Sequence, residues 1–517
     1  MKLLDFAVNK TNEYIEKMPK SLRKKYGQFF TSKETAVFMA GLFDIPSGKE
    51  ELLVLDAGAG SGILSVALLE RLQTFTDINK IRLVCYENDE NITELLIENL
   101  NHVCQNARSE IVYEIRTDNY ITSQLEDYGE MIGACPSPLK YDIVIGNPPY
   151  MKIAKDAPEA KAMPDVCYGA PNMYFLFASM GMFNLMDDGE MVYIIPRSWT
   201  SGAYFKQFRK KFLREGALTH IHLFVSRDKV FEKESVLQET IIIKMKKSQV
   251  KPPSVIITTT QSNKDFSDIK VFNISYDTAI SGEDSYVYLA TNAQEVDVLQ
   301  KLNCWQHTLP SLGLKMKTGL TVDFRNRDVL RNEFEEEAVP LFYSQHIQNG
   351  YVKFPIGKDN EYIMSDKAGL VQRNINYLFV KRFTSKEERR RLQCGVYLAN
   401  MHPEYERIST QNKINFIDGA EELSDCIVYG LYVIFNSTVY DCYYRILNGS
   451  TQVNSTEINA MPMPPLDVIS AMGSEMLRKK DMSEDSCDQI IRGFIHEQNT
   501  GSKSGIKRAA GASKTAS

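Results

Sequence analysis

Four consecutive residues, Asn147-Pro-Pro-Tyr150, have the types needed to hold a planar ring that bears an amino group. The two prolines fix φ and remove two backbone donors, and Pro148 also biases Asn147 away from the helical region. The Asn147 side-chain oxygen and the Pro148 carbonyl can accept hydrogen bonds from both N–H groups of such an amine, while the Tyr150 ring stacks on its face. The alternative is a proline turn in which Tyr150 is ordinary packing.

The elements that position this turn begin with segment 141–146, whose apolar run predicts a short buried strand. Another apolar segment, 51–56, leads into a glycine-rich turn and then an apolar helix, an order typical of an open α/β sheet that binds a nucleotide-like ligand. Gly58, Gly60 and Gly62 let the backbone approach a ligand closely. The Walker A and Gly-x-Gly-x-x-Gly patterns are both absent. The acid that ends the strand, Asp56, would repel phosphates but can accept from an amine or a bound water, so we expect a zwitterionic amino-acid ligand.

Acidic residues follow the next two predicted strands. Glu87 follows segment 81–86, and an acid at this position commonly binds ribose hydroxyls in such folds, although a surface acid is the alternative. Asp118 follows segment 111–116 and could accept from an adenine amino group. We therefore expect both acids to contact a nucleoside.

Strands and helices alternate as far as residue 244, which predicts a mostly parallel sheet covered on both faces. The composition then shifts to Lys, Pro, Ser and Thr over residues 246–264, which predicts a domain boundary. We expect a catalytic domain over 1–250, a second domain over 265–475, and a helix with a disordered tail over 476–517. Candidate strands of the second domain are 338–343, 376–380 and 427–435.

The overall charge excludes a globally basic protein, because 60 Lys and Arg face 66 Asp and Glu, a net charge of −6. A nucleic-acid surface must then be a local patch. The nine cysteines contain no Cys-x-x-Cys pair and the seven histidines no ligand pattern, so we expect reduced thiols and no metal. No apolar run reaches transmembrane length and the N-terminus lacks a signal-peptide pattern. We expect a cytoplasmic protein without a membrane partner.

One local basic patch is the run over residues 382–391. Its basic members are Arg382, Lys386, Arg389, Arg390 and Arg391. Such a run would contact DNA phosphates, which position a protein without specifying sequence. The alternative is a solvated helix face.

Taken together, these motifs resemble the N6-adenine DNA methyltransferases in which a target-recognition domain follows the catalytic domain. Gly27-Gln-Phe-Phe-Thr31 resembles the family's N-terminal S-adenosylmethionine motif, Asp56–Gly62 its glycine loop and Asn147–Tyr150 its catalytic motif. The ordered motifs cover residues 20–245, and the remainder matches loosely. The resemblance implies a Rossmann-like class I S-adenosylmethionine-dependent methyltransferase domain followed by a mixed α+β target-recognition domain.

The resemblance also implies roles for single residues. Phe177 resembles the aromatic that packs on the cofactor's adenine, and Phe231 resembles the second aromatic lining a flipped-base pocket with Asn147 and Tyr150. The implied catalytic residues are Asn147, Pro148 and Tyr150. The implied cofactor residues are Phe30, Thr31, Asp56, Gly58, Gly60, Gly62, Glu87, Asp118 and Phe177. The expected DNA-binding residues are Arg382, Lys386, Arg389 and Arg390.

Two segments of the second half, 436–440 and 454–464, look like type II modification enzymes of the PstI and BsuBI kind. This likeness implies a double-stranded DNA partner, a palindromic site such as CTGCAG, a cognate restriction endonuclease on a separate chain, and a monomer. The implied reaction moves a methyl group from S-adenosylmethionine to N6 of an adenine flipped out of the duplex, without a metal or a covalent intermediate.

Three alternatives stay open. Related enzymes use the same four residues to methylate a protein glutamine or an RNA base, and the large C-terminal half favours DNA over these substrates. A non-catalytic DNA-binding subunit is disfavoured by the intact Asn147–Tyr150 motif. A fused nuclease is disfavoured because we find no convincing Pro-Asp…Asp/Glu-x-Lys segment.

Overall fold

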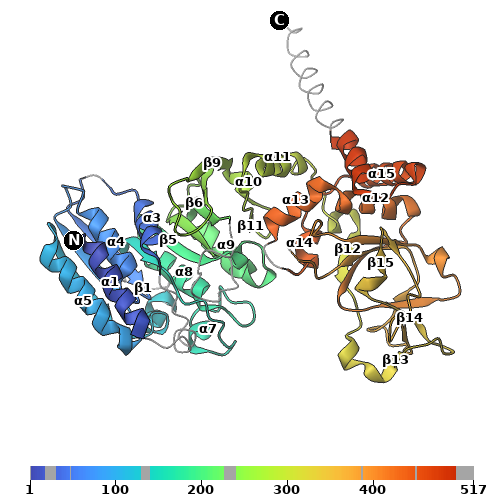
Figure 1. The fold of residues 1–517 in the computed structure, drawn as a ribbon, viewed down its shortest axis with the longest axis horizontal. Coiled ribbons are helices and arrows are strands. Elements are labelled where there is room, and N and C mark those ends of the chain that lie inside the picture. The colour runs from blue at the N-terminus through green and yellow to red at the C-terminus, as the bar shows by residue number, and fades with distance from the viewer. Residues whose placement is uncertain are drawn as a thin grey trace, which may run out of the picture. The chain divides into compact units, whose positions relative to one another are not determined.

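The computed structural model describes residues 2–17, 31–46, 48–129, 140–225, 240–385, 388–448 and 451–495. The chain forms two compact units, Met1–Ala293 and Gln294–Ser517 (Figure 1). None of the described helices is long and apolar enough to cross a membrane. The eight cysteines within the described ranges are all free thiols.

One nine-stranded sheet runs through the first unit in the order β3-β2-β1-β4-β5-β7-β6-β8-β9. The strands are β1 (Glu51–Ala57), β2 (Lys80–Tyr86), β3 (Glu110–Arg116), β4 (Tyr141–Gly146), β5 (Leu185–Pro196), β6 (Ala217–Phe224), β7 (Thr240–Lys246), β8 (Ser254–Thr260) and β9 (Lys270–Ser275), with a separate hairpin of β10 (Ile280–Ser281) and β11 (Tyr286–Val287). Strands β1 to β5 pair in parallel, while β7 runs antiparallel to β5 and β6. All of β4 is buried, as expected for a central parallel strand. The predicted α/β class with a mostly parallel sheet is confirmed.

Helices cover both faces of this sheet. They are α1 (Leu3–Lys17), α3 (Lys33–Gly41), α4 (Ile63–Leu72), α5 (Glu90–Asn106), α6 (Leu125–Gly129), α7 (Pro158–Ala162), α8 (Met173–Asn184), α9 (Lys206–Glu215) and α10 (Tyr276–Ala279). On one face, α1, α3, α4 and α5 share a hydrophobic core with residues of β1, β2, β4 and β5. On the other face, α8 lies over Val144, Met191 and Tyr193, because a Cβ added at Gly181 would approach all three side chains. Successive strand residues point to opposite faces, so β4 and β5 contribute to both cores.

The two units divide further along the chain than the composition predicted. The polar segment 246–264 contains β8, which pairs with β6, and β9 then pairs with β8. Thr258 and Thr260 are buried in β8 because the His222 ring hydrogen-bonds to both hydroxyls, at 2.9 and 3.1 Å. The first unit therefore continues to Ala293, beyond the expected end at residue 250.

The second unit combines two sheets with helices, which confirms the predicted mixed α+β class. The sheet orders are β12-β22-β19-β20-β16-β15 and β13-β17-β14-β21-β18. The strands are β12 (Leu314–Thr318), β13 (Leu330–Arg331), β14 (Val339–Phe342), β15 (Ile347–Gln348), β16 (Tyr351–Val352), β17 (Tyr362–Ile363), β18 (Gln372–Arg373), β19 (Tyr377–Lys381), β20 (Cys394–Tyr397), β21 (Arg407–Thr410) and β22 (Ile414–Gly419). The helices are α11 (Ala293–Leu302), α12 (Asp425–Asn436), α13 (Thr438–Leu447), α14 (Ser455–Asn459) and α15 (Leu466–Lys479), followed by a helix over 484–495. The tail predicted to be disordered lies beyond the described residues.

One predicted strand of the second unit is wrong. Residues 427–435 belong to helix α12, which begins where the Ser424 side chain accepts a hydrogen bond from the Ile427 amide. Residues 428–436 are buried on all sides of this helix. An apolar run that is buried all round has no periodicity to distinguish a helix from a strand, which explains the error.

Candidate active site

The predicted motifs of the first unit meet at one edge of its sheet. Strands β2, β1 and β4 are parallel neighbours, with Ala57 opposite Tyr86 and Asp56 opposite Ile145. Their carboxyl ends therefore lie side by side. Ligands of open α/β sheets bind at this edge.

The glycine turn after β1 is hydrogen-bonded to the end of β2. The Gly58 amide donates to the Tyr86 carbonyl at 2.8 Å, and the Gly60 amide donates to the Glu87 carboxylate at 2.8 Å. Gly58, Gly60 and Gly62 have φ values of 75°, 57° and 83°, which other residues rarely adopt. Burial raises the pKa of Glu87, although its hydrogen bonds oppose this rise. Glu87, the acid predicted to bind a ribose, is thus hydrogen-bonded directly to the glycine turn.

Asp56 ends β1 beneath this turn and is completely buried. The Ser65 hydroxyl, in α4, donates to Asp56 Oδ2 at 2.6 Å, whereas Asp56 Oδ1 has no hydrogen-bond partner among the described residues. Burial raises the pKa of Asp56 to about 7 against the effect of the Ser65 hydrogen bond, and the charge of Glu87 adds to the rise. A buried acceptor without a partner is costly, so Asp56 is suited to receive a donor from a bound cation or water.

In the turn after β4, both the nitrogen and the oxygen of the Asn147 side-chain amide are hydrogen-bonded. Asn147 Nδ2 donates to Thr31 Oγ1 at 3.2 Å, and the Tyr150 hydroxyl donates to Asn147 Oδ1 at 2.6 Å. The same hydroxyl also lies 3.0 Å from the Ile194 carbonyl of β5. The amide oxygen is therefore turned away from Thr31 and toward Tyr150.

The structure differs from the sequence prediction at the Tyr150 ring. Only 7% of Tyr150 is exposed, and its ring makes an edge contact with Tyr174 of α8 at 6.4 Å between centroids. The predicted open stacking platform is thus mostly covered, because the hydroxyl points inward to the sheet rather than outward.

Aromatic rings form a row beside the glycine turn. Tyr86 contacts Tyr120 at 4.9 Å between ring centroids, and Tyr120 contacts Phe177 at 5.1 Å. Phe177 reaches the turn, because its ring would lie 3.6 Å from a Cβ added at Gly58. Tyr120 is a buried core residue, whereas Asp118, predicted to bind an adenine amine, is exposed at the end of β3.

In the basic run of the second unit, the described residues 382–385 and 388–391 are not helical, and their exposure varies from residue to residue. Arg382 donates to the Asn412 carbonyl at 2.9 Å, and Arg390 donates to the Thr438 hydroxyl at 2.8 Å and pairs with Glu484 at 3.3 Å. The Arg389 side chain remains 82% exposed, although it also pairs with Glu484. Among the described arginines of this run, Arg389 is therefore the most exposed to solvent. Phe30, Phe231 and Lys386 lie outside the described residues.

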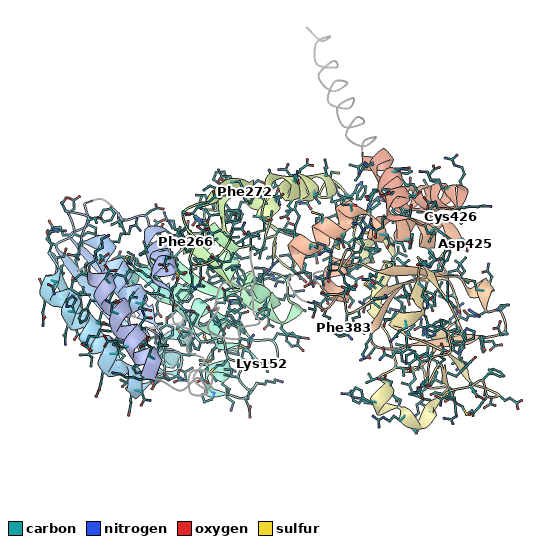
Figure 2. The ribbon with its side chains drawn as sticks, viewed as in Figure 1. Lys152, Phe266, Phe272, Phe383, Asp425 and Cys426 are labelled. Carbon is teal, nitrogen blue, oxygen red and sulfur yellow. The ribbon has the colours of Figure 1, made fainter. Side chains whose placement is uncertain are left out.

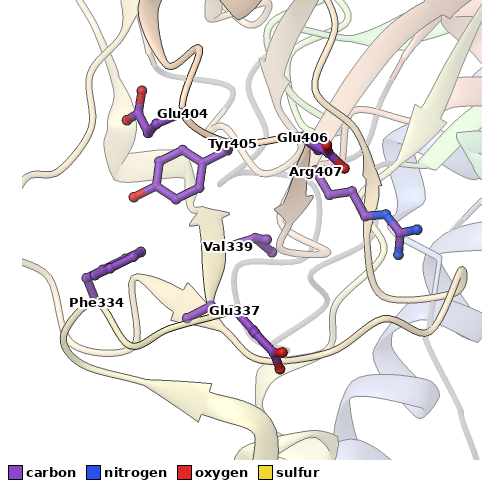
Figure 3. Close-up of a pocket in the computed structure, with 8 residues that line it drawn as sticks. Phe334, Glu337, Val339, Glu404, Tyr405, Glu406 and Arg407 are labelled. Atoms are coloured by element: carbon purple, nitrogen blue, oxygen red, sulfur yellow. The ribbon is translucent and has the colours of Figure 1, made fainter.

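A cavity of about 540 Å³ in the second unit contains none of the predicted site residues (Figure 3). Its lining includes three carboxylates, those of Glu337, Glu404 and Glu406, against the single cation of Arg407. This balance is unfavourable for a phosphate or a carboxylate ligand.

Sequence reasoning named Thr31 as a cofactor residue but missed its contact with Asn147, and it missed Ser65 altogether. Thr31 lies 116 positions before Asn147, so no local pattern shows the hydrogen bond between them. Ser65 could have been found, because the first turn of a helix after a glycine turn faces back toward the strand end.

Comparison with known proteins gives consistent matches. The family described as Eco57I restriction-modification methylase matches residues 72–231. The type II methyltransferase M.PstI of Providencia stuartii is 32% identical over 476 residues, which cover 89% of this chain and 91% of that protein. The type II methyltransferase M.BsuBI of Bacillus subtilis is 33% identical over 463 residues, which cover 87% and 90%. A release factor glutamine methyltransferase of Fusobacterium nucleatum is 30% identical over 144 residues, which cover 27% and 32%.

Proposed function

The chain belongs to the type II DNA methyltransferases of restriction–modification systems, and on this premise we propose that it methylates N6 of adenine in duplex DNA with S-adenosylmethionine as the donor. The observation that carries the proposal is that the Asn147-Pro-Pro-Tyr150 turn lies beside the glycine turn, since a Cβ added at Gly58 would lie 3.9 Å from Pro149 Cδ. This turn carries the Asn147 amide oxygen and the Pro148 carbonyl. Two acceptors at this position suit the two N–H bonds of an exocyclic amine.

The residues around the glycine turn fit the cofactor. Asp56 Oδ1 is a buried acceptor that suits the ammonium group, and Glu87 is fixed beside the turn for ribose hydroxyls. Asp118 and Phe177 would hold the adenine, and we assign Phe30 and Thr31 to the cofactor as well, on the resemblance of their motif. When bound, S-adenosylmethionine supplies the methyl group from its sulfonium. We assign no metal to the reaction.

The Asn147 oxygen must become available to the substrate amine. It now accepts from the Tyr150 hydroxyl, but that hydroxyl can donate to the Ile194 carbonyl 3.0 Å away instead. Thr31 meanwhile holds the amide nitrogen, so the amide does not turn over and its oxygen stays on the side away from Thr31. Accepting both N–H bonds favours a pyramidal, more nucleophilic nitrogen, and positioning for in-line attack supplies much of the acceleration.

The target atom is unreachable within a stacked duplex, so the adenine must be flipped out at a cost of a few kcal/mol. Stacking on aromatic side chains would offset this by roughly 1–3 kcal/mol per contact. We propose Tyr150 and Phe231 for these contacts, and the 7% exposure of Tyr150 means that its ring must be uncovered when the base enters.

Target recognition is assigned to the second unit, with Arg389 as a phosphate contact. A CTGCAG site, a separate cognate endonuclease, a monomeric state and a cytoplasmic location stay predictions. Methylation of a protein glutamine is the less favoured substrate class, because the glutamine methyltransferase matches only 27% of the chain, whereas the type II enzymes match both units.

Modification-sensitive long-read sequencing of DNA from cells that express this protein tests the proposal. We expect N6-methyladenine at one recurring motif, absent from cells that carry the empty vector. Methylated cytosine at the motif, or no new modification, would refute the assignment.

A further inference from the structure

A pair of exposed tyrosines lies at the surface of the first unit, and one of them belongs to the loop that follows the catalytic turn. Residues 151–172 connect Tyr150 to α8, and the two ends of this loop are hydrogen-bonded to each other. The Ile153 amide donates to the Pro171 carbonyl at 2.8 Å, and the Met173 amide donates to the Met151 carbonyl at 2.9 Å. The loop therefore projects from a fixed base directly beside the active site.

Tyr168 of this loop and Tyr204, in the short 3₁₀ turn Ala203–Phe205, are each 60% exposed. Their ring centroids are 6.1 Å apart, with planes inclined by 58°. The Lys152 ammonium lies 5.8 Å from the Tyr204 centroid, and Figure 2 labels this lysine at the surface of the unit. Gly169, whose φ of 76° favours glycine, lies beside the Tyr204 ring, since a Cβ there would be 3.4 Å from it. Large apolar groups gathered at a surface mark interaction sites.

The same packing that holds Tyr150 also holds this pair. Phe205, the neighbour of Tyr204, is buried with its ring 5.9 Å from that of Tyr174. Tyr174 in turn contacts the ring of Tyr150, and its hydroxyl is 3.0 Å from Ser198 Oγ. The chain at Tyr204 is thus anchored through Phe205 to the ring that packs on Tyr150.

The loop contains three lysines and three acids, and two of the acids have partners in the structure whereas Asp156 is exposed. Glu159 accepts from the Asn119 amide at 2.8 Å, and Asp165 forms an ion pair with Lys211. The exposed lysines are Lys152, Lys155 and Lys161, and none of them forms an ion pair with another described residue. Aromatic rings beside unpaired lysines suit a single-stranded or unstacked nucleic acid.

We propose that Tyr168, Tyr204 and Lys152 form a second DNA contact of the catalytic unit, where the rings stack on bases that lose their neighbour when the target base leaves the duplex. Lys152 contacts a phosphate beside them. The proposal deepens the proposed function and rests on it, because flipping is what exposes such bases. Stacking on an aromatic ring tolerates any base, so this contact stabilises the opened duplex without reading sequence.

The test compares Tyr204→Ala with Tyr204→Phe and with Val271→Ala, a matched control at an exposed apolar residue of the edge strand β9. The DNA is a duplex with the motif that sequencing identifies, carrying 2-aminopurine at the target position. We expect Tyr204→Ala to weaken duplex binding by roughly five-fold to one hundred-fold and to reduce the fluorescence of the unstacked probe. Tyr204→Phe and Val271→Ala should behave like the wild type, and all variants should bind S-adenosylmethionine equally in calorimetry.

Two further measurements separate this inference from the proposed function. Lys152→Gln should lower the slope of log affinity against log salt by about one. Binding to single-stranded oligothymidylate needs no motif, and Tyr204→Ala should weaken it as well. If the wild type makes N6-methyladenine but Tyr204→Ala binds and flips DNA normally, the second contact is refuted alone. If the wild type methylates no adenine, the proposed function fails, and unchanged oligothymidylate binding by Tyr204→Ala would still refute the contact.

Discussion

Lowering the pH from 7.5 to 6.0 should weaken S-adenosylmethionine binding through Asp56. Burial raises the pKa of this carboxyl to about 7, and its Oδ1 has no hydrogen-bond partner among the described residues. If the ionised carboxylate accepts from the cofactor's ammonium, the protonated form must lose its proton before the cofactor binds. The apparent dissociation constant then grows by the factor 1 + 10^(pKa − pH), roughly 1.3 at pH 7.5 and roughly 11 at pH 6.0, an eight-fold weakening.

The Asp56 carboxyl should also affect the stability of the ligand-free protein. Its contribution favours the folded state at low pH, where cofactor binding is weakened. Raising the pKa of Asp56 from 3.8 to about 7 means that ionising it in the folded state costs roughly 4 kcal/mol. Between these two values the folded state binds more protons at this site than the unfolded state. The contribution of Asp56 to stability is therefore fully present below pH 3.8 and is lost as the pH rises through 7.

Calorimetry at both pH values on the wild type and on Asp56→Asn measures the effect. The asparagine keeps the shape of the aspartate side chain and an acceptor for the Ser65 hydroxyl, but it carries no charge. S-adenosylmethionine binding should therefore be weaker and independent of pH in this range. Glu87→Gln should keep a pH dependence that is shifted to lower pH, because the charge of Glu87 adds to the rise in the pKa of Asp56. Circular dichroism at each pH confirms that the protein is folded. Equal wild-type affinity at the two pH values, or the same pH dependence in Asp56→Asn, would refute the reasoning.

Three further predictions concern single residues. Tyr150→Phe removes the donor shared by Asn147 and Ile194, so thermal unfolding should show a loss of about 1–3 kcal/mol while methyl incorporation stays within roughly ten-fold of the wild type. Gly62→Ala places a Cβ 2.7 Å from Leu96 at a φ of 83°. Calorimetry should show weaker cofactor binding, and denaturant unfolding should show that the free energy of unfolding falls by at least about 1 kcal/mol. Arg389→Ala should weaken all DNA binding and lower its salt slope by about one, an effect that an unchanged slope would exclude.

The centre of the fold could be predicted from the sequence because its signals are local. Segment 141–146 is apolar throughout and is buried throughout as β4. The alternation of strands and helices before residue 244 likewise predicted the order of the elements. This order brings Asp56, Glu87 and Asn147 to one edge of the sheet. The boundary was misplaced because β8 buries threonines, and their burial depends on His222, 38 positions away from Thr260.

The remaining differences come from contacts between residues far apart in the chain. No local pattern shows that the partners of Arg390 are Thr438 and Glu484, so a basic run looked like an open surface. The burial of Tyr150 has the same origin, since the Ile194 carbonyl that attracts its hydroxyl belongs to the neighbouring strand. The pattern indicated which side chains lie at this edge of the sheet but could not show which of them were already engaged in hydrogen bonds.

The most direct test of the central claim is the identity of the methylated nucleoside made by purified protein. The wild type and Asn147→Ala are incubated with duplex DNA and S-adenosylmethionine that carries an isotopic methyl label, and the digested nucleosides are identified by mass spectrometry. We predict labelled N6-methyldeoxyadenosine from the wild type. Asn147→Ala should make it at least about one hundred-fold more slowly, with cofactor and DNA affinities nearly unchanged, because it loses an acceptor that acts in the chemical step. Labelled methylcytosine from the wild type, or a wild-type rate from Asn147→Ala, would contradict the account.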